Sequence, residues 1–189
     1  DIYNQFIQMP KTSILQTLSE SHYYYIRNVW FGRYAQYNAS DNSITPVNGK
    51  SEDDTYLWRI KKNDDGTVFI YSKKTETAAY LASNAVDQKV KVGKDYAWTL
   101  EERTLDGKSG ICSIDGSKKY SWYTNPDAWT YILMKPFWGA CTWEFQKSGV
   151  EVPTGIGDIE ETENGKRETE NCYDLSGRQV RKAAKGVYI

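Results

Sequence analysis

The chain has 189 residues, which suits one domain with extensions and is long enough to bury a core without metals or many disulfides. It carries 24 Lys and Arg against 25 Asp and Glu, so its charge offers no footprint for nucleic acid or an anionic membrane. No apolar run reaches about 18 residues, which predicts that no helix inserts into a membrane. No signal peptide is visible, and Asp1 fits either a cleaved signal or a piece of a longer chain.

Residues 1–21 are expected to form a linker with a short helix. Ile14, Leu15 and Leu18 make an apolar stripe after two potential capping residues. A helix this short is marginal in isolation. It is therefore expected either to dock on the next domain or to belong to a junction with an upstream one.

Residues 22–149 contain three similar blocks that end in a tryptophan strand. Trp58, Trp98 and Trp143 are spaced 40 and 45 residues apart, and an apolar residue follows each of them two positions later. Period-two alternation places both residues on one face of a strand. The three tryptophans are predicted to occupy equivalent, buried core positions.

Each tryptophan block follows three more strand-like runs rich in aromatic and β-branched residues. The predicted runs are 23–28, 33–38 and 43–47 in the first repeat, 67–72, 79–84 and 89–92 in the second, and 110–114, 119–124 and 131–135 in the third. Asp65-Gly66 and Asp115-Gly116 are strong turn signals. The pattern predicts an all-β domain of twelve strands in three fours, too few repeats for a propeller of about 4–8 blades.

The repeats resemble ricin-type β-trefoil lectins, in which each repeat of about forty residues ends in a similar tryptophan strand. The resemblance covers about two-thirds of the chain and implies a β-trefoil fold with pseudo-threefold symmetry. In that family a largely structural Gln usually stands two places before the Trp. Here the positions hold Tyr56, Tyr96 and Cys141, which indicates a divergent branch.

Three cysteines are present, Cys112, Cys141 and Cys172, and their spacing fits no metal motif. Either all three are free and mostly buried, or Cys112 and Cys141 pair. We expect no metal and no cofactor.

Residues 150–171 are charged and poor in apolar side chains, which predicts a mobile linker, above all over 158–170. Residues 172–189 form a separate tail with the strand-like runs 172–180 and 186–189. The tail resembles the C-terminal segment of exported Bacteroidetes proteins, where a Tyr-Asp-Leu-x-Gly-Arg-x-Val strand precedes Lys-Gly-x-Tyr-Ile. That resemblance implies export to the periplasm, the cell surface or the medium, and in this chain the second strand stops early.

Catalytic motifs are missing from the sequence. The single histidine, His22, stands at the entry to the first strand, and no nucleophile elbow, phosphate loop or Cys-x-x-Cys occurs. We expect a non-catalytic module, which leaves room for an upstream catalytic domain.

In the ricin-type family a sugar pocket combines an Asp on the second strand with an aromatic platform near the third. The resemblance puts the Asp position near Gln36, Ala82 and Trp122, none of which is Asp. The second repeat has no aromatic in its third strand, so no sugar site is expected there. The first repeat offers a lesser candidate, which polar turn chemistry explains equally well: Tyr37, Asn38, Asp41 and Asn42.

The third repeat concentrates aromatic and polar residues that together favour a sugar site. The predicted sugar-binding residues are Trp122, Tyr123, Asn125, Asp127, Trp129, Tyr131 and Trp138. Phe137 belongs to the same aromatic cluster. One of Trp122 and Tyr123 is expected to face outward, because neighbours on a strand alternate. The alternative is that these rings pack inward. Trp30 and Phe31, in the first hairpin, are either exposed or close the barrel end.

The leading functional hypothesis is a carbohydrate-binding, lectin-like module that acts as a monomer beside a glycan-processing protein. Its partner is a polysaccharide or a glycoprotein sugar. Because fold alone does not give function, two rivals stay open. One is a protein-binding, adhesion or inhibitor trefoil, and the other is a structural spacer without a ligand.

Overall fold

The computed structural model describes residues 13–102, 108–115, 118–124, 131–136, 139–153, 172–173 and 179–180. The chain divides into two compact units, Asp1–Gly155 and Ile156–Ile189. Within the described ranges, no helix is long and apolar enough to cross a membrane.

The described strands of the first unit fall into three consecutive groups of four. The first repeat contains β1 (His22–Asn28), β2 (Arg33–Asn38), β3 (Ser43–Asn48) and β4 (Trp58–Lys62), with the 3-10 helix η2 (Asp54–Tyr56) before β4. The second contains β5 (Val68–Ser72), β6 (Ala79–Tyr80), β7 (Lys91–Val92) and β8 (Thr99–Glu102). The third contains β9 (Lys108–Asp115), β10 (Lys118–Tyr123), β11 (Leu133–Pro136), η3 (Gly139–Cys141) and β12 (Trp143–Glu151). The predicted all-β organisation in three fours is confirmed.

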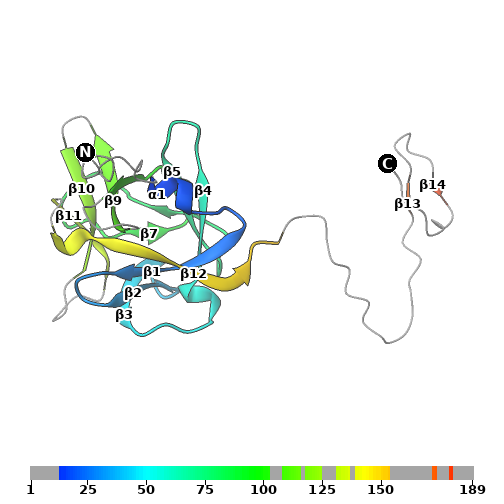
Figure 1. Cartoon of the computed structure of the whole chain (residues 1–189), viewed down its shortest axis with the longest axis horizontal. Helices are drawn as coiled ribbons and strands as arrows, with labels where there is room; N and C mark the ends of the chain where they lie inside the picture. The colour runs from blue at the N-terminus through cyan, green and yellow to red at the C-terminus, as the bar shows by residue number, and fades with distance from the viewer. Residues whose placement is uncertain are drawn as a thin grey trace, which may run out of the picture. The chain divides into compact units, whose positions relative to one another are not determined.

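The first and fourth strands of the repeats pair with one another, both within a repeat and across repeat boundaries. β1 pairs antiparallel with both β12 and β4, β4 with β5, and β9 with both β8 and β12. Between β5 and β8 the link is an isolated bridge, in which Val68 and Trp98 exchange two backbone hydrogen bonds of 2.8 Å. In Figure 1, β1 and β12 run side by side, so the last repeat is joined to the first.

The second and third strands form three hairpins that meet at a pseudo-threefold axis. The hairpins are β2–β3, β6–β7 and β10–β11. Ile44 N donates to Val90 O at 3.0 Å, Val90 N to Ile132 O at 3.0 Å, and Ile132 N to Ile44 O at 2.8 Å. All three side chains are fully buried. This cyclic exchange between equivalent residues confirms the β-trefoil predicted from the sequence.

The three repeat tryptophans occupy equivalent core positions, as the spacing predicts. Their side chains are fully buried. Each indole Nε1 donates to a carbonyl oxygen on the second strand of its own repeat: Trp58 to Ala35 at 3.0 Å, Trp98 to Ala79 at 2.9 Å, and Trp143 to Trp122 at 2.8 Å. Because a buried indole N–H without an acceptor would be costly, this shared hydrogen bond fixes how each repeat packs against its own hairpin.

The segment before β1 packs on the trefoil. The helix α1 (Ile14–Thr17) follows Ser13, and Ile14 and Leu18 belong to the same hydrophobic core as the three tryptophans. The Ile14 N–H donates to Glu102 Oε1 at 2.9 Å, which ties the helix start to β8. Of the two alternatives for this segment, the described residues adopt the docked one.

Two of the three cysteines are buried free thiols, Cys112 and Cys141. Burial raises the pKa of the Cys112 thiol to about 12, so it stays protonated and behaves as a small apolar side chain. No metal-ligand cluster occurs among the described side chains.

The second unit contains two short antiparallel strands, β13 (Cys172–Tyr173) and β14 (Gln179–Val180). Cys172 lies opposite Val180, and Tyr173 opposite Gln179. The two strands belong to the predicted run 172–180 and form a hairpin within it. The run 186–189 and the expected linker over 158–170 lie outside the described residues.

Candidate functional site

Trp122 lies inside the core, so the prediction that it binds sugar is wrong. Its side chain is fully buried, and Trp98 and Trp143 pack edge-to-face against it at ring-centroid distances of 5.4 and 6.1 Å. Its position is equivalent to those of Ala35 and Ala79, which accept the same indole hydrogen bond. In this part of the core the third repeat therefore has an indole, where the other two repeats have a methyl group.

Tyr123 lies on the opposite face of β10, as alternation predicts, but that face is covered as well. The residue is only 9% exposed and packs with Ala140 and Cys141 of η3 and with Phe31 from the β1–β2 turn. The expectation that one of Trp122 and Tyr123 faces outward is therefore wrong. Alternation decides only which face a side chain takes, whereas η3 and Phe31 decide that neither face of this strand end is open.

The indole hydrogen bonds also correct the alignment of the position that holds Asp in ricin-type sites. Gln36 is one residue past the acceptor Ala35, and the same count in the other repeats gives Tyr80 and Tyr123. The sequence alignment placed Ala82 and Trp122 there instead. Under either alignment none of the three positions holds Asp. Gln36 itself donates from Nε2 to Thr55 Oγ1 at 3.2 Å, so its amide already has a partner.

Tyr131 is the predicted sugar-binding aromatic that the structure leaves partly exposed. The Nζ of Lys89 lies 3.3 Å from its ring centroid, and the same ammonium group lies 3.7 Å from Asp41 Oδ2. One face of the ring is therefore occupied by a cation–π contact. The arrangement joins residues from all three hairpins near the pseudo-threefold axis.

The remaining predicted site residues, Asn125, Asp127, Trp129 and Trp138, lie outside the described residues, as does Phe137. The third-repeat sugar site therefore stays a prediction for these four. Three members of that cluster are described. Trp122 lies in the core, Tyr123 is covered by η3 and Phe31, and Tyr131 is partly exposed.

The lesser candidate in the first repeat consists of residues whose polar groups bond one another. Tyr37 donates its hydroxyl to Asn42 Oδ1 at 2.6 Å, and Asp41 Oδ1 accepts from both the N–H and the hydroxyl of Ser43. Asn38 Oδ1 likewise accepts from the N–H and the hydroxyl of Ser40, at 3.0 and 2.8 Å. These local bonds are the turn chemistry that the sequence offered as the alternative.

A groove of about 320 Å³ lies beside the β4–β5 hairpin and is lined by Glu20, Arg59, Ile60, Lys61 and Tyr71. The Arg59 guanidinium carbon lies 5.0 Å from the Tyr71 ring centroid, and the Tyr71 hydroxyl donates to Asp95 Oδ1 at 2.9 Å. Burial and this hydrogen bond raise the pKa of the Tyr71 phenol, which keeps it protonated as a donor. Phe69 also packs edge-to-face with the Tyr71 ring at a centroid distance of 6.1 Å, so this ring already has two partners.

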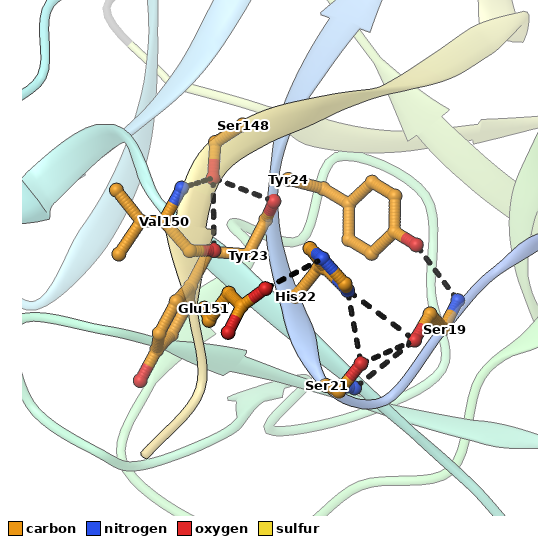
Figure 2. Close-up of polar contacts among 8 residues, drawn as sticks. All are labelled: Ser19, Ser21, His22, Tyr23, Tyr24, Ser148, Val150 and Glu151. Carbon is orange, nitrogen blue, oxygen red and sulfur yellow. Dashed lines mark hydrogen bonds and ion pairs between the residues drawn. The ribbon is translucent and has the colours of Figure 1, made fainter. Parts of the chain in front are cut away.

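The single histidine, His22, contacts two serines and a carboxylate (Figure 2). Ser21 Oγ lies 2.9 Å from His22 Nδ1, and Glu151 Oε1 lies 3.5 Å from Nε2. Serine, histidine and a carboxylate are also the three groups of the catalytic triads of hydrolases. Here the Glu151 side chain is 78% exposed, and Ser21 Oγ is also within 2.7 Å of Ser19 Oγ. Together with the bond from Val152 N to Ser21 O, the cluster fastens the start of β1 to the end of β12.

The sequence left open whether the side chain of Trp30 is exposed. Trp30, in the turn between β1 and β2, is 62% exposed. It does not close the barrel end, which was one of the two expectations for it. No periodic signal distinguishes it from a buried ring, because it stands in a turn where alternation does not apply.

No protein-family model matches the chain, and no curated protein matches it either. Solved structures do match. A ricin B-like lectin of Macrolepiota procera, in complex with lactose, superposes with a TM-score of 0.59 and 16% identity, covering 69% of this chain and 99% of the lectin. The agglutinin of Rhizoctonia solani gives a TM-score of 0.58 and 18% identity over 68% of this chain and 96% of that one. A designed threefold-symmetric protein, ThreeFoil, gives 0.57 and 14% over 66% and 97%.

These likenesses define the class of fold. The chain contains a β-trefoil of the kind found in ricin B-like lectins, and that trefoil corresponds to nearly the full length of each lectin. With identities below 20%, the likeness extends to the backbone and its repeats.

Proposed function

We propose that this chain is a non-catalytic carbohydrate-binding module. The observation that carries the proposal is the trefoil itself, which matches sugar-binding lectins over about two-thirds of the chain and almost all of their length. The partly exposed Tyr131 in the third repeat supports it, because an aromatic face binds the apolar face of a sugar ring. The absence of an Asp at the family's pocket position means that the sugar contacts differ from those of the family.

The first site we propose is the third-repeat cluster around Tyr131. The exposed part of the Tyr131 side chain would stack on the sugar, and Asn125 or Asp127 would bond its hydroxyls. The adjoining Lys89 and Asp41 offer a cation and a carboxylate beside the same ring. Affinity is expected to be weak, from about millimolar to tens of micromolar, because a shallow site immobilises a hydrated ligand for few contacts.

The test is a glycan array with the full chain, followed by calorimetric titration of the best-bound oligosaccharide. Tyr131→Ala and Trp129→Ala should each weaken binding, while the circular dichroism spectrum stays unchanged. Tyr80→Ala is the matched control, since Lys94 lies 5.0 Å from its ring centroid in the repeat for which no sugar site is expected. Equal losses in all three variants would indicate an effect on the fold and would count against this site.

The rival functions give different outcomes in the same assay. A protein-binding trefoil or a spacer would leave every glycan on the array unbound. Light scattering after gel filtration would test the proposed monomer at the same time.

Export is a separate part of the proposal. It is supported by the residue pattern of the tail over 172–189 alone, which resembles a C-terminal segment of exported proteins. Deleting residues 172–189 should keep the protein inside a cell that normally exports it. Continued export without the tail would overturn this part and leave sugar binding untouched.

A further inference from the structure

The β4–β5 hairpin carries two adjoining hollows on its surface. The groove of about 320 Å³ described above is lined in part by Arg59, Lys61 and Tyr71. A second hollow of about 530 Å³ is lined by residues 61–65, at the turn of the hairpin. Because Lys61 lines both, the two hollows are continuous along the hairpin, and together they are longer than a single small ion requires.

Arg59 lines this groove with donors that have no acceptor in the protein. Its Nη2 lies 3.6 Å from Glu76 Oε2, which is an ion pair beyond hydrogen-bond distance. Its Nε is buried without a hydrogen-bond partner. No described residue accepts a hydrogen bond from this guanidinium, although buried donors are normally paired. Since 30% of the side-chain surface is exposed, the guanidinium can be reached from the groove.

Lys61 adds a second cation, whereas the acidic groups around the groove already accept from the protein. Lys61 is exposed, and no described residue pairs with its ammonium group. The carboxylates that line the groove or contact its residues each accept one hydrogen bond: Glu20 from Lys62 N, Glu76 from the Tyr23 hydroxyl, and Asp95 from the Tyr71 hydroxyl. The groove therefore has charged donors in excess, and a ligand that fits it must supply the acceptors.

The trefoil itself does not require these two cations. Arg59 and Lys61 stand one and three residues past the repeat tryptophan Trp58. The corresponding residues of the other repeats are uncharged or acidic: Thr99 and Glu101 in β8, and Glu144 and Gln146 in β12. The two acidic ones have cationic partners within the protein, Lys119 for Glu101 and Lys108 for Glu144. The cations of the first repeat are therefore a local addition to a fold that forms without them elsewhere.

Resting on the sugar-binding function proposed above, we propose that the groove beside β4–β5 binds the carboxylate of an acidic sugar. Arg59 and Lys61 donate to the carboxylate, because a guanidinium presents paired donors that match its two oxygens. The next sugar extends past Lys61 into the second hollow, where Asn63 and Asp64 offer partners for its hydroxyls. This second hollow favours an oligosaccharide over a free anion, which would leave it empty.

The experiment titrates the full chain by calorimetry with disaccharides that end in one glucuronate or galacturonate. Each is paired with the neutral disaccharide that has a hydroxymethyl group in place of the carboxylate. At least one acidic disaccharide should bind about tenfold more tightly than its neutral counterpart. Arg59→Gln should abolish that difference, and Arg59→Lys, which keeps the charge but loses the paired donors, should retain part of it.

Two further variants keep the test decisive. Lys61→Gln should reduce the preference for the acidic sugar about threefold without affecting the fold, because Lys61 is exposed. It decides the matter if the Arg59 variants fail to fold. Lys118→Gln is the matched control, since it removes one charge from an exposed lysine of the third repeat. A loss in Lys118→Gln as large as that in Lys61→Gln would indicate a general charge effect and overturn the site.

The outcomes separate this inference from the proposed function. If neutral glycans bind and no acidic disaccharide binds more tightly than its counterpart, the protein binds sugar and the groove inference is wrong. If no glycan binds at all, both proposals fall. Sodium acetate and the blocked peptide glycyl-glutamyl-glycine present the same carboxylate on other carriers. Binding of either as tight as that of the best acidic disaccharide would overturn the choice of a sugar.

Discussion

Two tryptophans of this chain, Trp122 and Trp30, lie in opposite environments. Trp122 is fully buried among Trp98 and Trp143, in a position where the other repeats place Ala35 and Ala79. Trp30 is 62% exposed in a turn whose counterpart carries Lys74. Both depart from the threefold pattern, one inward and one outward. An aromatic-rich sequence therefore does not locate a binding surface until its strands and turns are packed.

The largest loss of stability is expected when the buried Trp122 is replaced. Trp122→Ala is expected to lower the free energy of unfolding by about 3–5 kcal/mol, because the surrounding indoles cannot collapse into the space it leaves. Equilibrium denaturation with guanidinium would measure this. Although alanine occurs at the equivalent positions of the other repeats, a loss below about 1.5 kcal/mol would mean that the core can relax toward their packing.

The second prediction concerns the hydrogen bonds that hold the backbone of the exposed Trp30 in place. Asn28→Ala removes three hydrogen bonds from a buried amide and leaves the Ala140 carbonyl without that donor, so we expect a loss of about 1–3 kcal/mol. Asn28→Ser is the matched variant, since Ser72 stands at the equivalent position of the second repeat. It should cost less and should increase the mobility of Trp30, which time-resolved fluorescence anisotropy would detect. Unchanged anisotropy in both variants would show that the Asn28 hydrogen bonds do not hold the ring.

A third effect concerns the carboxylate behind the same turn. Burial alone would raise the pKa of Glu144, but hydrogen bonds from Lys108, Arg27 and Gln146 outweigh it and hold the pKa below its usual value. A group whose pKa is lowered by folding stabilises the fold above its unfolded pKa and loses that contribution as the pH falls through the folded value. Wild-type stability should therefore drop between about pH 5 and 3 more than that of Glu144→Gln. Thermal melts across this range would measure the difference, and parallel curves would contradict it.

The smallest expected effect on stability is that of the outward tryptophan itself. Trp30→Ala should change the free energy of unfolding by no more than about 0.5 kcal/mol, because most of its ring is already in water. The same denaturation experiment as for Trp122→Ala gives the comparison directly. A loss near that of Trp122→Ala would show that Trp30 is a structural residue.

The sequence by itself determined the fold. Trp58, Trp98 and Trp143, at their spacing of 40 and 45 residues, predicted a buried residue that each repeat places in the same way. Because strand alternation is a local property of the backbone, it located the core-facing residues without knowledge of the neighbours. The turns and strand limits followed, with differences of a few residues, as in β6, which ends at Tyr80 while the predicted run extends to residue 84.

Only the tertiary structure decided which rings are available to a ligand. Alternation correctly put Trp122 and Tyr123 on opposite faces of β10, but whether the outward face is open depends on η3 and Phe31. In the same way, the exposure of Trp30 depends on Asn28 reaching Ala140 and on Gly139 lacking a side chain. Asn28 and Ala140 lie 112 residues apart along the chain, and no local period in a sequence reports which distant segment comes to cover a residue.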